Sequence, residues 1–99
     1  RVISGDTVEI TFVKKLLDIT FVTTRVCRLA RIQCEKTNTA QGLQALEYLK
    51  GLVAVKDLKL VAHDYGRYGI IMVDLFANKV SVNKEMVIKG YAREFKRGG

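Results

Sequence analysis

The N-terminal third of the chain alternates between apolar and polar residues, which is typical of a strand with one buried face. Val8, Ile10 and Phe12 form the apolar side of a stretch that covers residues 7–13. A second run, rich in β-branched and aromatic residues, covers residues 19–32. Because Lys14, Lys15 and Asp18 form a polar tip between the two runs, the pattern predicts a long β-hairpin that returns on itself.

The middle of the chain has the spacing of a helix. Leucines recur at intervals of three residues along residues 43–52. Asn38, followed three residues later by Gln41, fits a capping box. The sequence therefore predicts a helix that begins near Thr39 and ends near Gly51.

Two further strands and a second helix are expected after this helix. Residues 58–62 form a short apolar run, and residues 69–76 form a longer one that is typical of a central strand. Asn83 is placed to cap a short helix over residues 84–89. Gly90 follows that helix, where a left-handed C-terminal cap favours glycine.

The order of these elements predicts the fold class. Val2 and Ile3 suit the tail of a first strand before the hairpin, so the chain has three strands, a helix, two strands and a short helix. This is the order of the OB-fold, a five-stranded barrel that binds oligonucleotides on one face. We expect a mainly β, α+β domain: a five-stranded OB-fold barrel with a helix between strands 3 and 4 and a short second helix. The length suits a single domain over residues 1–99.

The charge of the chain favours a polyanionic partner. Seventeen Lys and Arg residues against ten Asp and Glu residues give a formal net charge of +7. Nucleic acid and an acidic membrane face both attract such a surface. No apolar run approaches the roughly 20 residues of a membrane span, so we expect nucleic acid rather than a membrane, and a monomer. The sequence does not indicate a cellular compartment.

Common catalytic and metal-binding motifs are absent from the sequence. His63 is the single histidine and is expected in an exposed turn, while Cys27 and Cys34 lack the partner histidines of a zinc site. What remains is a set of acids and arginines at turns and strand ends. Asp6 follows Gly5 in a turn, where its carboxylate either caps the turn or ligates a hard cation such as calcium. An arginine on a binding face suits phosphate, because its planar fork bonds two oxygens at once.

Four segments, in order along the chain, resemble motifs of the staphylococcal nuclease-like family. They are Val2-Ile3-Ser4-Gly5-Asp6-Thr7, Val26-Cys27-Arg28-Leu29-Ala30-Arg31-Ile32, Asp64-Tyr65-Gly66-Arg67, and Val82-Asn83 followed by Gly90-Tyr91-Ala92. They are similar to the family's V-x-D-G-D-T turn, its V-R-L-x-G-I-D strand, its D-x-Y-G-R turn and its V-N…G-x-A ending. Arg31 stands where that strand has its glycine. No single piece is specific, but four in the right order around a helix make the match strong.

The resemblance implies an activity and a set of site residues. Members of this family cleave phosphodiester bonds of DNA and RNA with calcium. In the family two carboxylates hold the metal, a glutamate acts on the attacking water and two arginines stabilise the transition state. Carried over to this chain, the resemblance places Asp6 and Gln33 at the metal, and Arg28, Glu35 and Arg67 as catalytic residues.

The chain departs from the family at several positions. Gln33 supplies a neutral amide where a carboxylate is expected, which should weaken calcium binding. If one residue is missing at the family's proline, Glu35 takes the place of the glutamate; without that gap Lys36 does. The resemblance also implies a domain trimmed at both ends, because only residues 1–4 precede the first turn and the family's third helix is missing beyond Arg97.

Three functions are compatible with these residues. The first is a calcium-dependent endonuclease, weakened by Gln33, that acts on single-stranded DNA or RNA. The alternative is a catalytically inactive relative that keeps the nucleic-acid groove, and a third is a protein-interaction module. In the first two, Tyr65 and Tyr91 are candidates for stacking on bases, with packing at the barrel edge as the competing interpretation.

Overall fold

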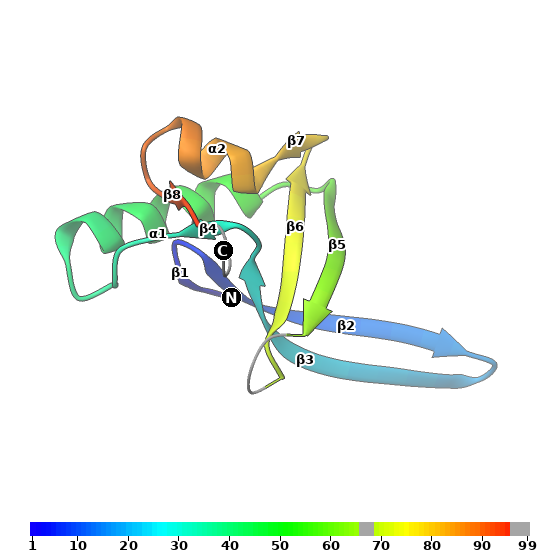
Figure 1. Ribbon diagram of the computed structural model, residues 1–99. Helices are drawn as coiled ribbons and strands as arrows, with labels where there is room; N and C mark the ends of the chain where they lie inside the picture. The colour runs from blue at the N-terminus through cyan, green and yellow to red at the C-terminus, as the bar shows by residue number, and fades with distance from the viewer. Residues whose placement is uncertain (66–68, 96–99) are drawn as a thin grey trace.

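The computed structural model describes residues 1–65 and 69–95, and Figure 1 shows the arrangement of their elements. The strands are β1 (Val2–Ser4), β2 (Thr7–Leu16), β3 (Ile19–Leu29), β4 (Ile32–Gln33), β5 (Leu58–Tyr65), β6 (Ile71–Ala77), β7 (Val80–Ser81) and β8 (Arg93–Glu94). The helices are α1 (Ala40–Val53) and α2 (Val82–Ile88).

Most of the strands belong to one sheet. Its order is β1-β2-β3-β6-β5, with β7 paired to β6, and its neighbours are antiparallel except for β3 and β6. A parallel pair needs a long crossover, which α1 and β5 supply here. This mostly β arrangement with two helices confirms the predicted OB-like α+β class. The separate ladder between β4 and β8 has two residues on each strand, which is too short to leave a periodic pattern in the sequence.

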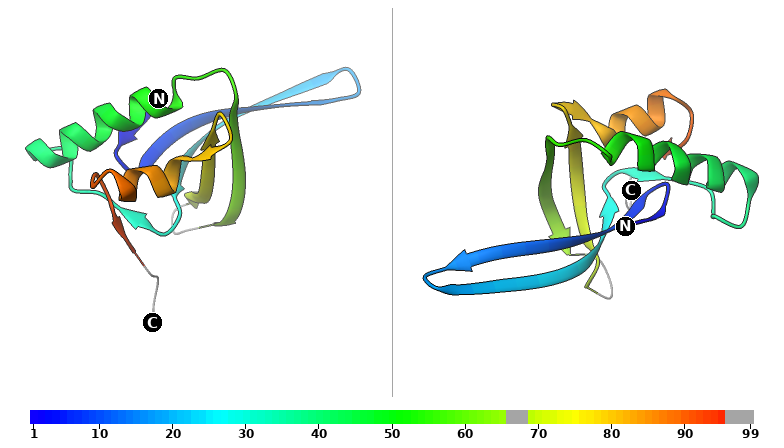
Figure 2. Two further views of the ribbon diagram at one scale, coloured as in Figure 1. Left: turned by 90° about the horizontal axis from the view of Figure 1, so that it is seen from above. Right: turned by 180° about the vertical axis from the view of Figure 1, so that it is seen from behind.

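Strands β2 and β3 form a hairpin whose outer half projects away from the helices (Figures 1 and 2). Its ladder runs from Thr7 opposite Arg28 to Leu16 opposite Ile19. Strands β1 and β6 pair with it only near its base. The large apolar residues of the outer half are exposed: Val13, Leu16, Leu17, Ile19, Phe21 and Val22. The predicted hairpin is confirmed, and its base is the part that joins the body of the domain.

The core lies between the inner part of the sheet and the two helices. Its most completely buried side chains come from β3, β6 and both helices: Cys27, Leu29, Ala45, Leu49, Val73, Leu75, Val82 and Met86. Burying one leucine-sized side chain stabilises a fold by about 1.5–3 kcal/mol. These residues therefore hold the hairpin base, the central strand and the helices as one packed unit. The predictions of a buried Cys27 and a central strand β6 are confirmed.

The helix caps differ from the prediction by a few residues. Thr39, not Asn38, caps α1, and its Oγ1 accepts a hydrogen bond from the Gly42 N–H at 3.0 Å. Ser81, not Asn83, caps α2, because the amide of Asn83 is buried against the sheet. The expected left-handed turn after α2 is confirmed at Gly90, whose φ is +81°.

Helix α1 buries a narrower face than its leucines suggest. Its buried residues are Gly42, Ala45 and Leu49, whereas Leu43 is 53% exposed. Gly42 lets the helix approach the loop after β4, because a Cβ there would clash with the Lys36 carbonyl, and Ala45 packs against Gly5 in the β1–β2 turn. Within residues 1–65 and 69–95, neither helix combines the length and the apolar character that a membrane crossing requires.

Candidate nucleic-acid site at the hairpin base

Asp6 lies in the turn between β1 and β2, pressed against α1. A Cβ atom on Gly5 would lie 2.6 Å from the Cβ of Ala45 and 2.8 Å from the Sγ of Cys34, so this close approach requires glycine. The contact carries Asp6 beneath the helix and leaves the residue only 8% exposed. The Asp6 carbonyl also accepts a hydrogen bond from the Leu29 N–H at 2.8 Å, which ties the turn to the end of β3.

Four protein groups engage the Asp6 carboxylate. Its Oδ1 accepts hydrogen bonds from the hydroxyls of Ser4 at 2.8 Å and Thr7 at 2.9 Å. Its Oδ2 accepts a hydrogen bond from the Cys34 N–H at 3.0 Å and lies 3.6 Å from Nη2 of Arg28. A carboxylate has about four acceptor positions. The protein therefore already satisfies this acid.

A cavity of about 450 Å³, which we call the Asp6 cavity, lies at the base of the hairpin. Its lining residues come from the β1–β2 turn, β3, β4 and the loop after β4: Ser4, Asp6, Arg28, Gln33, Cys34, Glu35, Lys36, Thr37 and Asn38. The structure thus brings together four residues that the sequence places in one site, Asp6, Arg28, Gln33 and Glu35. Because Lys36 lines the same cavity, the choice between Glu35 and Lys36 stays open.

The lining of the Asp6 cavity carries two cations, Arg28 and Lys36, and two acids, Asp6 and Glu35, so its formal charges balance. The Arg28 side chain is 37% exposed and makes one 3.6 Å contact with Asp6, so most of its five N–H donors stay available. Lys36 adds a second cation to the lining. The Glu35 carboxylate, by contrast, lies 3.7 Å from Nη2 of Arg93. Both acids of the cavity are therefore opposed by an arginine.

The thiol of Cys34 does not add a reactive group to this cavity. Burial, assisted by the negative charge of Asp6, raises the pKa of the Cys34 thiol to about 12. A thiol with such a pKa stays protonated at neutral pH, and the thiolate is the form that attacks or binds metal. Burial also raises the pKa of Cys27, which belongs to the core.

The donor set of the Asp6 cavity does not fit calcium as it stands. Calcium takes six to eight oxygen ligands, in which carboxylates supply the charge. Here the carboxylate of Asp6 is occupied, that of Glu35 is paired with Arg93, and Gln33 is neutral. In the described part of the chain, no group of three or more His, Cys, Asp or Glu residues could hold a metal ion. Three hydrogen bonds already fill most of the acceptor positions of the Asp6 carboxylate, and a dication at the remaining position would have to displace Arg28.

Three predicted site residues are not among those that line the Asp6 cavity in the described part of the chain: Tyr65, Arg67 and Tyr91. Arg67 falls outside the described residues. Tyr65 is the last residue of β5, and its backbone pairs in register with Ile71 of β6. The Tyr91 ring stacks on the ring of Tyr48, with centroids 4.4 Å apart and planes inclined by 20°. One face of Tyr91 is thus covered, and its contact with a base stays a prediction.

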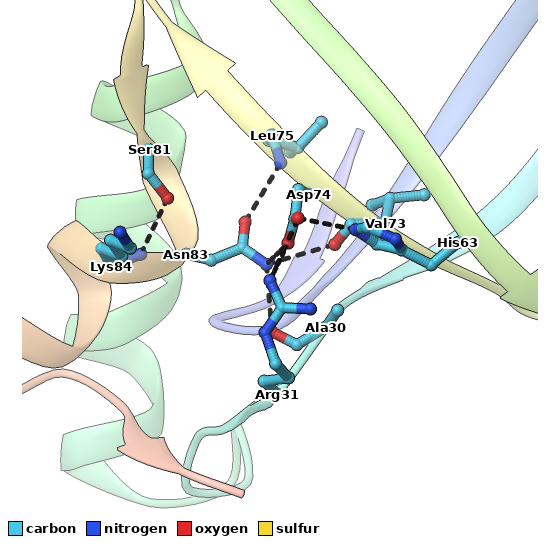
Figure 3. A network of polar contacts seen from close by, with 9 residues as sticks. All are labelled: Ala30, Arg31, His63, Val73, Asp74, Leu75, Ser81, Asn83 and Lys84. Carbon is cyan, nitrogen blue, oxygen red and sulfur yellow. Dashed lines mark hydrogen bonds and ion pairs between the residues drawn. The ribbon is translucent and has the colours of Figure 1, made fainter. Parts of the chain in front are cut away.

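A second polar cluster surrounds Asp74 on β6 (Figure 3). Nη2 of Arg31 donates to both carboxylate oxygens, at 2.8 and 3.0 Å, and Nε2 of His63 lies 2.6 Å from Oδ2. Burial alone would raise the pKa of Asp74, but the hydrogen bonds from His63 and Arg31 outweigh it and hold the pKa below its usual value. The predicted turn position of His63 is wrong, because this residue lies on β5 at a bulge between Ala62 and Asp64.

Asn83 joins this cluster from the first turn of α2 (Figure 3). Its Nδ2 donates to the carbonyls of Ala30 and Val73 and to Oδ1 of Asp74, each at 3.1 Å. Its Oδ1 accepts a hydrogen bond from the Leu75 N–H at 3.1 Å. This buried amide fixes the start of α2 to β6 and to the end of β3. The sequence signal for the cluster is Asp74 itself, the one charged residue within the apolar run of β6.

The backbone explains why the resemblance places a glycine where this chain has Arg31. The φ angle of Arg31 is +65°, in the left-handed region that glycine adopts without steric cost. Arg31 accepts this strain and places its guanidinium on Asp74. The strand end therefore keeps the expected turn with a different residue.

The strand order and the two helices, with a cavity at the hairpin base that Arg28 and Lys36 line, define an OB-like domain of the kind that binds nucleic acids. The sequence matches the family described as staphylococcal nuclease homologue over residues 25–98, and the chain belongs to that family. Among curated proteins, none matches the chain. The matched range includes Arg28, Gln33 and Glu35, whereas Asp6 precedes it. Domains of this family bind nucleic acids, and its nucleases generally depend on calcium.

Proposed function

We propose that residues 1–99 form a single staphylococcal nuclease-like domain that binds single-stranded DNA or RNA by its phosphates and does not use calcium. The arrangement at the Asp6 cavity carries this proposal. Arg28 and Lys36 line it, while the Asp6 carboxylate accepts three hydrogen bonds and contacts Arg28. Glu35, the second acid of the lining, lies 3.7 Å from Arg93. Two cations beside two acids that other protein groups oppose suit a phosphate, which forms strong charge-assisted hydrogen bonds with a guanidinium. The formal net charge of +7 also favours binding of a polyanion.

The residues of the site then have distinct roles. Arg28 is the main phosphate contact, because its planar fork can donate two parallel hydrogen bonds. Lys36 adds a point charge, and Arg67 is a second phosphate contact by resemblance. Tyr65 and Tyr91 are the candidates for contact with bases.

Cleavage of the strand is the competing function. The residue at position 33 distinguishes cleavage from binding alone. Four of the five residues that the resemblance assigns to cleavage do line one cavity: Asp6, Arg28, Gln33 and Glu35. A domain that binds without cutting needs no second carboxylate at position 33. The neutral amide there, together with the satisfied Asp6, is why we favour binding.

The proposal is tested by the affinity for a fluorescent twelve-nucleotide oligo-dT over a range of NaCl concentrations. Roughly three to five phosphate contacts would give a log–log slope of about −2 to −4, and Arg28→Ala should reduce its magnitude by about 0.7. Arg28→Lys should keep most of the slope. Arg25→Ala is the matched control. It removes the same charge as Arg28→Ala, but Arg25 lies on the opposite face of the same strand.

Two results would contradict the proposal. A salt-independent affinity would exclude phosphate contacts as its source. Calcium-dependent cutting of the oligonucleotide by the unmodified domain would show that Asp6 is available to a metal after all.

A further inference from the structure

A second cavity, of about 470 Å³, adjoins the Asp6 cavity. The two share Gln33 and Glu35 in their linings. The other residues of the second cavity come from α1 and from the segment after α2: Gln41, Gln44, Lys89, Gly90, Tyr91, Ala92 and Arg93. We call it the glutamine cavity. If a nucleic-acid strand places one phosphate beside Arg28, the sugar and base next to that phosphate can reach the glutamine cavity.

Three amide side chains meet at the glutamine cavity. Gln41 and Gln44 are three residues apart on α1 and therefore share a face of the helix, while Gln33 belongs to β4. Within residues 1–65 and 69–95, none of these three amides has a hydrogen-bond partner in the protein. Each offers donors and an acceptor side by side. That is the pattern with which Asn and Gln side chains recognise the edges of nucleobases.

The charged and aromatic groups of this cavity also suit a nucleic-acid strand. Lys89 and Arg93 supply two cations and Glu35 one anion, and Arg93 lies 3.7 Å from Glu35. The formal net charge of this lining is +1, against 0 for the Asp6 cavity, so its charged groups attract the strand, and the aromatic group is the one that suits a base. Tyr91 belongs to the wall, and its stacking on Tyr48 holds the ring in a fixed orientation. An ordered aromatic wall favours a flat ligand, because bases gain free energy from stacking.

We propose that the glutamine cavity binds a nucleobase of the same strand whose phosphate occupies the Asp6 cavity. This inference rests on the proposed function and adds the base to the phosphate as a recognised group. The volume lies within the range of about 300–1,000 Å³ that ligand pockets have. The shared residues Gln33 and Glu35 then lie between the phosphate contact and the base contact.

The test compares two probes of equal length and charge, twelve-nucleotide oligo-dT and its counterpart built from abasic residues. The unmodified domain should bind oligo-dT at least fivefold more tightly than the abasic strand. The double variant Gln41→Ala, Gln44→Ala should lose at least about fivefold affinity for oligo-dT, because each of the two lost hydrogen bonds weakens binding by a few-fold to tenfold. Its affinity for the abasic strand should not change. Leu43→Ala is the matched control, because it is a neutral, exposed residue of α1 outside the cavity.

Each other outcome overturns a defined part of the argument. Equal affinity of the unmodified domain for the two probes would overturn base binding while leaving phosphate binding intact. An equal loss on both probes in the double variant would also overturn it, since the amides would then contact the backbone. Failure of the unmodified domain to bind either probe would overturn the proposed function itself.

Discussion

The guanidinium of Arg28 lies 3.6 Å from the carboxylate of Asp6, and both side chains line the same cavity. The acid that the resemblance assigns to a metal here holds an arginine, two hydroxyls and a backbone N–H. It orders the β1–β2 turn against the loop after β4 and keeps Arg28 at the base of the hairpin. These contacts give Asp6 a structural role. The effects of substitution and of calcium that this role predicts differ from those expected of a metal ligand.

Asp6→Asn should lower the free energy of unfolding by about 2–4 kcal/mol, because charge-assisted hydrogen bonds are lost and Arg28 loses its partner. Urea denaturation of the variant and the unmodified domain measures this difference. Millimolar calcium should leave the Tm of the unmodified domain unchanged. A clear rise of that Tm with calcium would show that a metal competes successfully for the carboxylate.

Substitution of Arg31 should separate backbone strain from the contact with Asp74. Arg31→Ala keeps the left-handed backbone at +65° and loses the ion pair, whereas Arg31→Gly loses the ion pair and the strain. A left-handed non-glycine residue costs about 1–2 kcal/mol, and an exposed ion pair contributes about 0–1 kcal/mol. We expect the glycine variant to be about 1 kcal/mol more stable than the alanine variant. Equal unfolding free energies of the two would refute the strain argument.

Acid should weaken the domain through Asp74. Because the folded pKa of this carboxyl lies below its usual value of 3.8, the unfolded state binds the proton first as the pH falls. Its stabilising contribution is therefore complete above about pH 4 and is lost as the pH falls through the folded pKa. Asp74→Asn should be less stable at neutral pH by about 1–2 kcal/mol and should lose less stability between pH 4 and pH 2. Parallel pH profiles for the two proteins would contradict this assignment.

The parts of the fold that the sequence predicts are those with a repeating pattern. Alternation identifies the β2–β3 hairpin, and leucine spacing identifies α1. The two-residue strands β4 and β8 have no period, so only their pairing reveals them. The cap of α2 was misplaced because Ser81 and Asn83 both suit a cap, and local sequence cannot tell which one the sheet buries.

The candidate site was predictable as a set of residues but not as a set of contacts. Asp6, Arg28, Gln33 and Glu35 share a cavity, as the resemblance implies. The hydrogen bond from the Cys34 N–H to Asp6 joins positions 28 residues apart, so no local motif contains it. The contact between His63 and Asp74 similarly joins two strands, and His63 lies at a bulge in β5 that no local motif marks.

Gln33→Asp should create the calcium response that the unmodified domain lacks. The substitution places a second carboxylate in the Asp6 cavity, and carboxylate charge is the main determinant of calcium affinity. Free calcium at 100 times the Kd would then stabilise the variant by about 2.7 kcal/mol. Thermal unfolding at several calcium concentrations measures this effect. Gln33→Glu, which adds the same charge on a longer side chain, tests whether position as well as charge matters.

The same variant decides between Glu35 and Lys36. If Glu35 lies beside the bound phosphate, Gln33→Asp should cleave oligo-dT in calcium, and adding Glu35→Gln should slow cleavage by about 10²–10⁴-fold through loss of a general base. Lys36→Gln, the corresponding change at the neighbouring lining residue, should weaken binding and spare most of the cleavage rate. If Lys36 lies there instead, Gln33→Asp should bind calcium and remain inert, because a cation at that position holds phosphate but cannot accept a proton from water. A Gln33→Asp protein with no calcium response at all would remove both Asp6 and Gln33 from the list of potential metal ligands.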